Sequence, residues 1–279
     1  MKLLRPSLRA ALAIFAATAF GTVLAADPIP ITADQAFDAV TMHIDPETGD
    51  PANVVLIDVR DPVEYFFNGA AAEVTKIYLK GNRGKGRAVA PDWGKVRLLH
   101  DGKFVEYWVD GRYQRTQVAQ ISDLGMEALA YNIPLWWYDV ADGWGDLDER
   151  QDEQEAFRAA MDDFDANFPE QGSPYPGAPH KVILYCRTGG RSSIAGGLIA
   201  GSLFGAEDVY EIDDPAHQNG RGGFSGPAWS TSSTAYNGYN GYAGFPGRET
   251  PPDPREEVHA SVSWLDSGLP VITTVKPLP

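Results

Sequence analysis

The residues most able to do chemistry gather in one stretch, KVILYCRTGGRSSIAGGLIAGSLF, at residues 181–204. It holds Cys186, the only cysteine of the chain, between an apolar run and a glycine-rich turn. The turn consists of Arg187, Thr188, Gly189, Gly190, Arg191 and Ser192. Glycine permits positive φ angles, so successive backbone N–H groups can face inward and surround an anion. The helix predicted from about Ser192 would add the positive end of its dipole.

These groups favour a thiolate over a thiol, because positive charge and N–H donors stabilise the anion. The turn therefore predicts an exposed, ionised and nucleophilic Cys186. Two other interpretations compete with this one. Buried cysteines often serve as small apolar core residues, and an unpaired cysteine in an exported protein can form an intermolecular disulfide. The apolar run before Cys186 favours a core residue, whereas the glycines and arginines favour a reactive thiol more strongly.

The first 25 residues have the pattern of a secretory signal peptide. The basic residues Lys2, Arg5 and Arg9 precede the uncharged run AALAIFAATAFGTVLA, which ends with Val23 and Ala25 at the small-residue positions of a cleavage site. An uncleaved membrane anchor is the alternative, but the run is short for a span of about 20 residues. The sequence therefore predicts a periplasmic protein without a membrane segment after cleavage.

The charge of the chain is strongly acidic. Cleavage removes three of the 23 basic residues and none of the 38 acidic residues, so the net charge moves from −15 to −18. An acidic surface disfavours binding to nucleic acid and to anionic lipid, and it favours solubility. The remaining chain has room for one large domain or two small ones.

Three apolar runs predict an α/β domain. VVLIDV at 54–59, KVILY at 181–185 and DVYEI at 208–212 are typical of strands buried on both faces. Helical patterns at 31–44, 148–168 and 192–204 alternate with them. Thr32 and Gln35 have the spacing of a capping box at the start of the first pattern. An apolar stripe in the second, expected to serve core packing, consists of Phe157, Met161, Phe164 and Phe168. We therefore expect a mostly parallel sheet flanked by helices. Ligands of such sheets bind beyond the carboxyl ends of the strands, which is where Cys186 follows its strand.

Two segments differ from this pattern and are interpreted as insertions. Within residues 68–131, the pairs Asp101-Gly102 and Asp110-Gly111 join alternating runs and predict an antiparallel β-meander. Residues 213–255 form a long loop rich in glycine and tyrosine. Loops of this length are often functional, so this one is either a lid or partner platform near the site or an irregular surface flap.

Four segments, in this order, resemble the rhodanese (thiosulfate sulfurtransferase) domain family. They are LIDVRDPVEY at 56–65, NIPL at 132–135, YCRTGGRS at 185–192 and WLDSGLPV at 264–271. The resemblance spans residues 31–274 and implies a single rhodanese-like domain with two insertions. It implies a persulfide on Cys186, held by the loop from Arg187 to Ser192 and closed by Arg191. Asp58 and Arg60 match the DVR segment of the family, where an ion pair is expected to brace the fold near the loop.

The resemblance implies a sulfurtransferase. Sulfane sulfur would pass from thiosulfate, or a similar anionic donor, through Cys186 to a thiol or cyanide acceptor. Rhodanese-fold phosphatases carry C-x5-R, whereas Cys186 and Arg191 form C-x4-R, a loop too small for a phosphoryl group. No organic cofactor or metal is implied, because the five histidines are scattered and no G-x-S-x-G or Walker motif occurs.

Two other functions remain open. The domain is alternatively a non-catalytic sulfur carrier or binding module for a periplasmic protein partner, a role that the insertions favour because they can shape a docking face. A thiol redox protein is a third alternative, and the lack of a second, resolving cysteine counts against it.

Overall fold

The computed structural model describes residues 26–81, 85–99, 103–135, 147–167, 174–186, 190–213, 264, 267 and 269–272. The predicted signal peptide, residues 214–255 of the glycine- and tyrosine-rich segment, and Arg187, Thr188 and Gly189 lie outside the described residues. The helices are α1 (Ala33–Met42), α2 (Pro62–Asn68), α3 (Leu147–Asn167) and α4 (Gly190–Ile199), with short 3-10 turns at Asp92–Gly94, Val118–Gln120 and Ala206–Asp208.

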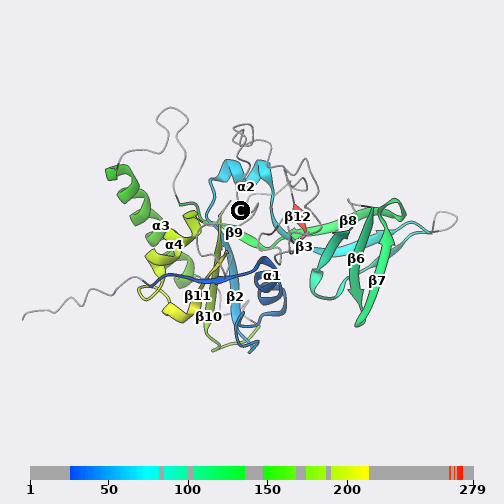
Figure 1. Ribbon diagram of the computed structural model, residues 1–279, viewed down its shortest axis with the longest axis horizontal. Helices are drawn as coiled ribbons and strands as arrows, with labels where there is room; N and C mark the ends of the chain where they lie inside the picture. The colour runs from blue at the N-terminus through cyan, green and yellow to red at the C-terminus, as the bar shows by residue number, and fades with distance from the viewer. Residues whose placement is uncertain are drawn as a thin grey trace, which may run out of the picture.

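A parallel sheet of five strands forms the centre of the fold (Figure 1). In spatial order it contains β1 (Ile29–Ile31), β11 (Val209–Ile212), β10 (His180–Tyr185), β2 (Asn53–Asp58) and β9 (Ala130–Asn132). All of its neighbouring pairs are parallel. The predicted strands in VVLIDV, KVILY and DVYEI are therefore confirmed, and so is the α/β class with a mostly parallel sheet.

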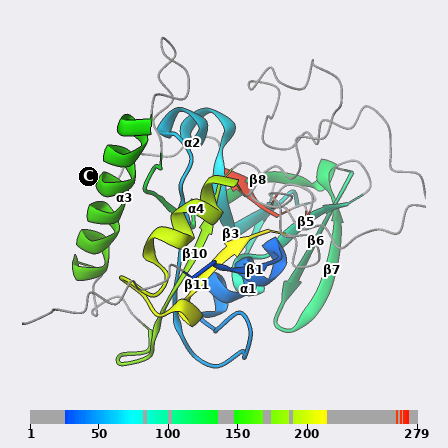
Figure 2. The same cartoon turned by 60° about the vertical axis from the view of Figure 1, so that its left-hand side comes forward.

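Helices cover both faces of this sheet (Figure 1, Figure 2). Alternate residues of each strand point to opposite faces. On the first face, Leu56 and Ile183 pack with Phe37 of α1. On the second face, Ile57 and Leu184 join a cluster formed with α3 and α4. The two central strands are thus buried on both sides, which explains their continuous apolar sequence.

The sequence patterns of two helices are also confirmed. At the start of α1, Thr32 Oγ1 accepts a hydrogen bond of 3.2 Å from the Gln35 N–H, and Gln35 Oε1 accepts one of 2.9 Å from the Thr32 N–H. This is the predicted capping box. In α3, Phe157 and Met161 are buried against the sheet, so these members of the predicted stripe serve core packing. Phe164 is half-buried, and Phe168 lies outside the described residues.

Between α2 and β9 the chain forms antiparallel strands, seen to the right in Figure 1. One sheet joins β3 (Ala70–Leu79) to β4 (Arg87–Val89), β8 (Ile121–Ala128) and β12 (Val271–Ile272), and another has the order β5 (Val96–Leu99), β6 (Phe104–Val109), β7 (Arg112–Gln117). The Asp110-Gly111 turn takes φ values of 52° and 69°, which suit a tight hairpin. The strands of the predicted meander are therefore present, with their own apolar cluster.

The end of the chain returns to the central core. Trp264 is buried against Phe37 of α1, with their ring centroids 5.6 Å apart, and its indole N–H donates a hydrogen bond of 2.8 Å to the carbonyl of Pro270. Strand β12 then pairs with the first residues of β3. The WLDSGLPV segment thus contributes to the same core as α1, although more than 200 residues separate them in sequence.

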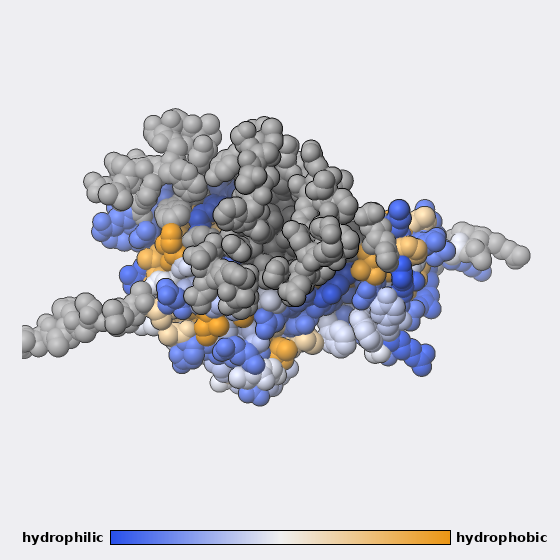
Figure 3. All heavy atoms as spheres, in the orientation of Figure 1, coloured by the Kyte–Doolittle hydropathy of each residue, from blue (hydrophilic) through white to orange (hydrophobic). Residues whose placement is uncertain are grey.

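The described residues visible in Figure 3 are mainly hydrophilic. The face in Figure 3 shows hydrophobic residues only in small, separate areas, as expected from the acidic composition. Among the described residues, no helix has the combination of length and apolar character that crossing a bilayer requires.

Two neighbouring glycines of α4 should respond oppositely to alanine. A Cβ atom at Gly196 would lie 2.6 Å from Pro28 Cβ, whereas one at Gly197 would have no neighbour within 4 Å. We expect Gly196→Ala to destabilise the fold by about 1–3 kcal/mol through overpacking. Gly197→Ala should stabilise it by about 0.5–1 kcal/mol, because alanine favours the helix. Urea unfolding of both variants measures this, and equal effects would contradict the close packing of α4 on the chain before β1.

Candidate functional site

The candidate site lies where the connections of the central sheet change direction. From β2 the chain continues to β9 on one side, and from β10 it continues to β11 on the other side. Such a change between adjacent parallel strands opens a crevice beyond their carboxyl ends. Tyr185, the last residue of β10, is paired with Asp58, the last residue of β2. Cys186 and Val59, the next residues of the chain, therefore lie at the carboxyl ends of these two strands.

The side chain of Cys186 is buried. It belongs to the apolar cluster of the second face, with Val59, Ala195 and Ile199, and it is 1% exposed. The prediction of an exposed thiol is therefore wrong. The physical reason is strand alternation: Cys186 has the same parity as Val182 and Leu184, so it points beneath α4.

Helix α4 brings a hydroxyl to this thiol. Gly190 is the first residue of α4, and Ser192 lies in its first turn with its side chain fully buried. The Ser192 hydroxyl hydrogen-bonds to Cys186 with an Oγ–Sγ distance of 3.8 Å. The predicted nest of backbone N–H groups involves Arg187, Thr188 and Gly189, which lie outside the described residues.

Arg191 supplies positive charge beside Cys186. Its Nη2 atom lies 2.5 Å from Glu64 Oε2 of α2. Burial alone would lower the pKa of Arg191, but charge interactions with Cys186 and with Glu64 outweigh burial and raise it. The guanidinium therefore stays charged, and the ion pair holds the first turn of α4 against α2.

Asp58 and Arg60 form the expected ion pair, and it lies on the first face of the sheet. Both side chains are buried, and Arg60 Nη2 lies 2.5 Å from Asp58 Oδ2. Arg60 also donates a hydrogen bond of 2.6 Å to the carbonyl of Gly69, and its guanidinium sits over the ring of Tyr185. Because Cys186 belongs to the apolar cluster of the second face, this pair braces the strand ends on the face opposite to the thiol.

Three residues of this region were not predicted from the sequence. Glu64 anchors Arg191, and the Asn132 amide donates hydrogen bonds of 2.9 Å to the carbonyls of Asp58 and Arg60. Glu211 of β11 is buried, and its pKa is raised to about 8, first by burial and then by the charge of Asp213. The sequence signal for Glu211 was a carboxylate inside the buried run DVYEI.

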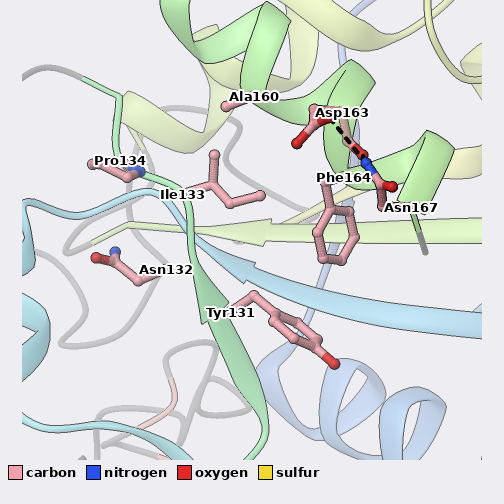
Figure 4. A pocket seen from close by; sticks show the side chains of 8 residues that line it. All are labelled: Tyr131, Asn132, Ile133, Pro134, Ala160, Asp163, Phe164 and Asn167. Atoms are coloured by element: carbon pink, nitrogen blue, oxygen red, sulfur yellow. Dashed lines mark hydrogen bonds between the residues drawn. The ribbon is translucent and has the colours of Figure 1, made fainter. Parts of the chain in front are cut away.

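A separate groove lies between β9 and α3 (Figure 4). It has a volume of about 480 Å³. Tyr131 and Phe164 meet in it with their ring centroids 5.1 Å apart. Cys186 does not line this groove, whereas Asn132 lines it and also binds the backbone beside Asp58. The end of β9 therefore connects the groove to the site, and Ile133 and Phe164 of the groove also pack against the apolar cluster that contains Cys186.

Within the part of the chain that the structure describes, no group of three or more His, Cys, Asp or Glu side chains is arranged to hold a metal ion. Comparisons of the chain with protein-family models, with curated proteins and with solved structures found no match.

The burial of Cys186 predicts that reagents are selected by size. Two reagents are compared: the small methyl methanethiosulfonate and the bulky dithiobis(nitrobenzoate). For each, the rate of reaction with Cys186 is divided by the rate with a free thiol. Because Cys186 is 1% exposed and access controls cysteine reactivity together with thiolate character, this ratio should be at least about ten times larger for the small reagent. Rates in denaturant provide the control, since both reagents should then reach the thiol. Equal relative rates in the native protein would contradict the buried position.

Proposed function

We propose that the protein is a rhodanese-type sulfurtransferase with Cys186 as its nucleophile. The observation that carries the proposal is the position of Cys186 at the carboxyl end of β10, beside the first turn of α4. There, Ser192 contacts the sulfur and the Arg191 charge lies close to it. The parallel sheet with helices on both faces is compatible with a rhodanese-like fold, and the C-x4-R loop suits one sulfur atom.

The proposed reaction has two halves, as in other covalent catalysis. The Cys186 thiolate attacks the outer sulfur of thiosulfate and forms an S–S bond. The original S–S bond of thiosulfate breaks, and sulfite leaves with its electron pair. A thiol or cyanide then attacks the outer sulfur of the Cys186 persulfide and regenerates the thiolate. Arg191 stabilises the negative charge on the sulfur, and the proposal assigns Arg187 to the anionic donor.

The burial of Cys186 supports a small donor. Thiosulfate and related sulfane-sulfur anions consist of few atoms, so they suit a thiol enclosed between α4 and the sheet. The alternative, a sulfur carrier for a periplasmic partner, is favoured by the groove between β9 and α3. There the side chains of Tyr131 and Phe164 line a surface beside the site.

Mass spectrometry of the intact protein tests this proposal. After incubation with thiosulfate, we expect a mass increase of one sulfur atom, located on the peptide that contains Cys186, and release of one equivalent of sulfite. Cyanide should then remove the sulfur as thiocyanate. Loading without turnover to cyanide or thiols would favour the carrier. The absence of any persulfide with thiosulfate or other sulfane-sulfur anions would overturn both proposals.

A further inference from the structure

Glu211 lies on the same face of the central sheet as the Cys186–Ser192 contact. In the register of β10 and β11, Glu211 is paired with Leu184. Paired residues of parallel strands point to the same face, and so do alternate residues of one strand. Leu184, Cys186 and Glu211 therefore all face α4. Ser192 in the first turn of this helix donates a hydrogen bond to Cys186. It also lowers the pKa of Glu211 through a side-chain hydrogen bond, which places the hydroxyl beside this carboxylate.

The carboxyl group of Glu211 is enclosed. Its side chain is 5% exposed, and its Oε2 atom has no hydrogen-bond partner among the described residues. Burial raises the pKa of Glu211 to about 8, the charges of Asp213 and Asp27 add to this, and the Ser192 hydroxyl opposes it. Glu211 therefore takes up a proton more readily than an ordinary carboxylate, because its charged form is poorly solvated in this place.

The serine hydroxyl connects two acids but can donate to only one of them. It has a single proton and two lone pairs. When Glu211 is ionised, Ser192 donates to it and can accept from the thiol. When Cys186 is ionised, Ser192 donates to the sulfur and can accept from the protonated Glu211. Two simultaneous negative charges would repel each other, and the positive charge of Arg191 is already shared with Glu64.

We infer that Cys186, Ser192 and Glu211 form a proton relay, in which Glu211 takes up the proton of the thiol. The S–H bond breaks and its electron pair stays on sulfur. The proton moves to the Ser192 oxygen while the original hydroxyl proton moves to the Glu211 carboxylate. Serine is unchanged, and one negative charge passes from Glu211 to Cys186 without a proton crossing to solvent. The role of this relay in turnover rests on the proposed sulfur chemistry, whereas the coupling of the two acids does not.

A pH titration of the thiolate tests the relay. The ultraviolet absorbance of the thiolate is obtained as the difference between the full-length protein and its Cys186→Ser variant. Acids that interact strongly titrate in two macroscopic steps that belong to the pair. We expect two steps in the wild type. In Glu211→Gln we expect a single one-proton step. Thiolate formation should be complete at a pH about one unit or more lower than in the wild type, because the negative charge of Glu211 is gone.

Matched variants separate the relay from general electrostatics. Asp213→Asn removes another buried acid near Glu211. It should shift the pH values of the titration steps, but the curve should still have two steps. Ser192→Ala removes the shared hydroxyl and should raise the pH at which the thiol ionises. Ser193→Ala, at the next position of α4, should leave the wild-type curve unchanged.

A wild-type titration that fits one proton overturns the relay, whether or not any variant folds. So does a Glu211→Gln curve that retains two steps. The proposed function is judged separately by persulfide formation. Two titration steps without a persulfide would leave the relay standing and remove the sulfurtransferase. A persulfide together with a single titration step would support the sulfurtransferase and overturn the relay.

Discussion

Replacing Cys186 with serine is expected to lower the rate of sulfur transfer from thiosulfate to cyanide at least about 10³-fold, because the nucleophile of a covalent mechanism cannot be replaced by binding alone. A serine hydroxyl at this position cannot form a persulfide. The chain has no other cysteine, so no second thiol in the protein can take over. Steady-state formation of thiocyanate measures the effect.

Cys186→Ala provides the control for folding. Cys186 lies in an apolar cluster, so alanine keeps the site apolar whereas serine adds a hydroxyl. Both variants should show near-native far-ultraviolet circular dichroism, and both should be inactive. A Cys186→Ala protein that folds and retains more than a tenth of the wild-type rate would refute the assignment of the nucleophile.

The second large effect concerns stability. Asp58→Ala leaves the Arg60 guanidinium charged and without its carboxylate partner in a position that is 1% exposed. Removing one partner of a buried ion pair lowers the free energy of unfolding by about 3–5 kcal/mol, because the remaining charge is neither solvated nor neutralised. Arg60 would retain the carbonyl of Gly69 as an acceptor. Urea unfolding should show a correspondingly lower midpoint.

Two further variants test whether the unpaired charge of Arg60 causes the loss of stability in Asp58→Ala. The double variant Asp58→Leu/Arg60→Met removes both charges, so it should be less destabilised than Asp58→Ala. Asp34→Ala breaks a partly exposed ion pair with Lys95 and Arg97 and should cost less than about 1 kcal/mol. If Asp58→Ala cost no more than Asp34→Ala, the bracing role of the buried pair would be wrong.

Local sequence patterns were sufficient for the elements around the site. The apolar runs before Asp58 and Cys186 predicted the central strands, the capping spacing of Thr32 and Gln35 predicted the start of α1, and the Asp110-Gly111 pair predicted a hairpin. These features depend on residues close together in the chain, such as turn conformation and apolar runs. The position of Cys186 after a strand and before a helix followed from the same patterns.

The tertiary structure decided which groups meet the sulfur. Alternation along a strand defines two faces, but only the strand order and the packing of the helices show which face each residue shares with others. They bury Cys186 beneath α4, place the Asp58–Arg60 pair on the opposite face, and bring Glu211 to Ser192 from another strand. Contacts between residues distant in sequence depend on strand register and on helix packing, and neither is encoded in a short segment of sequence.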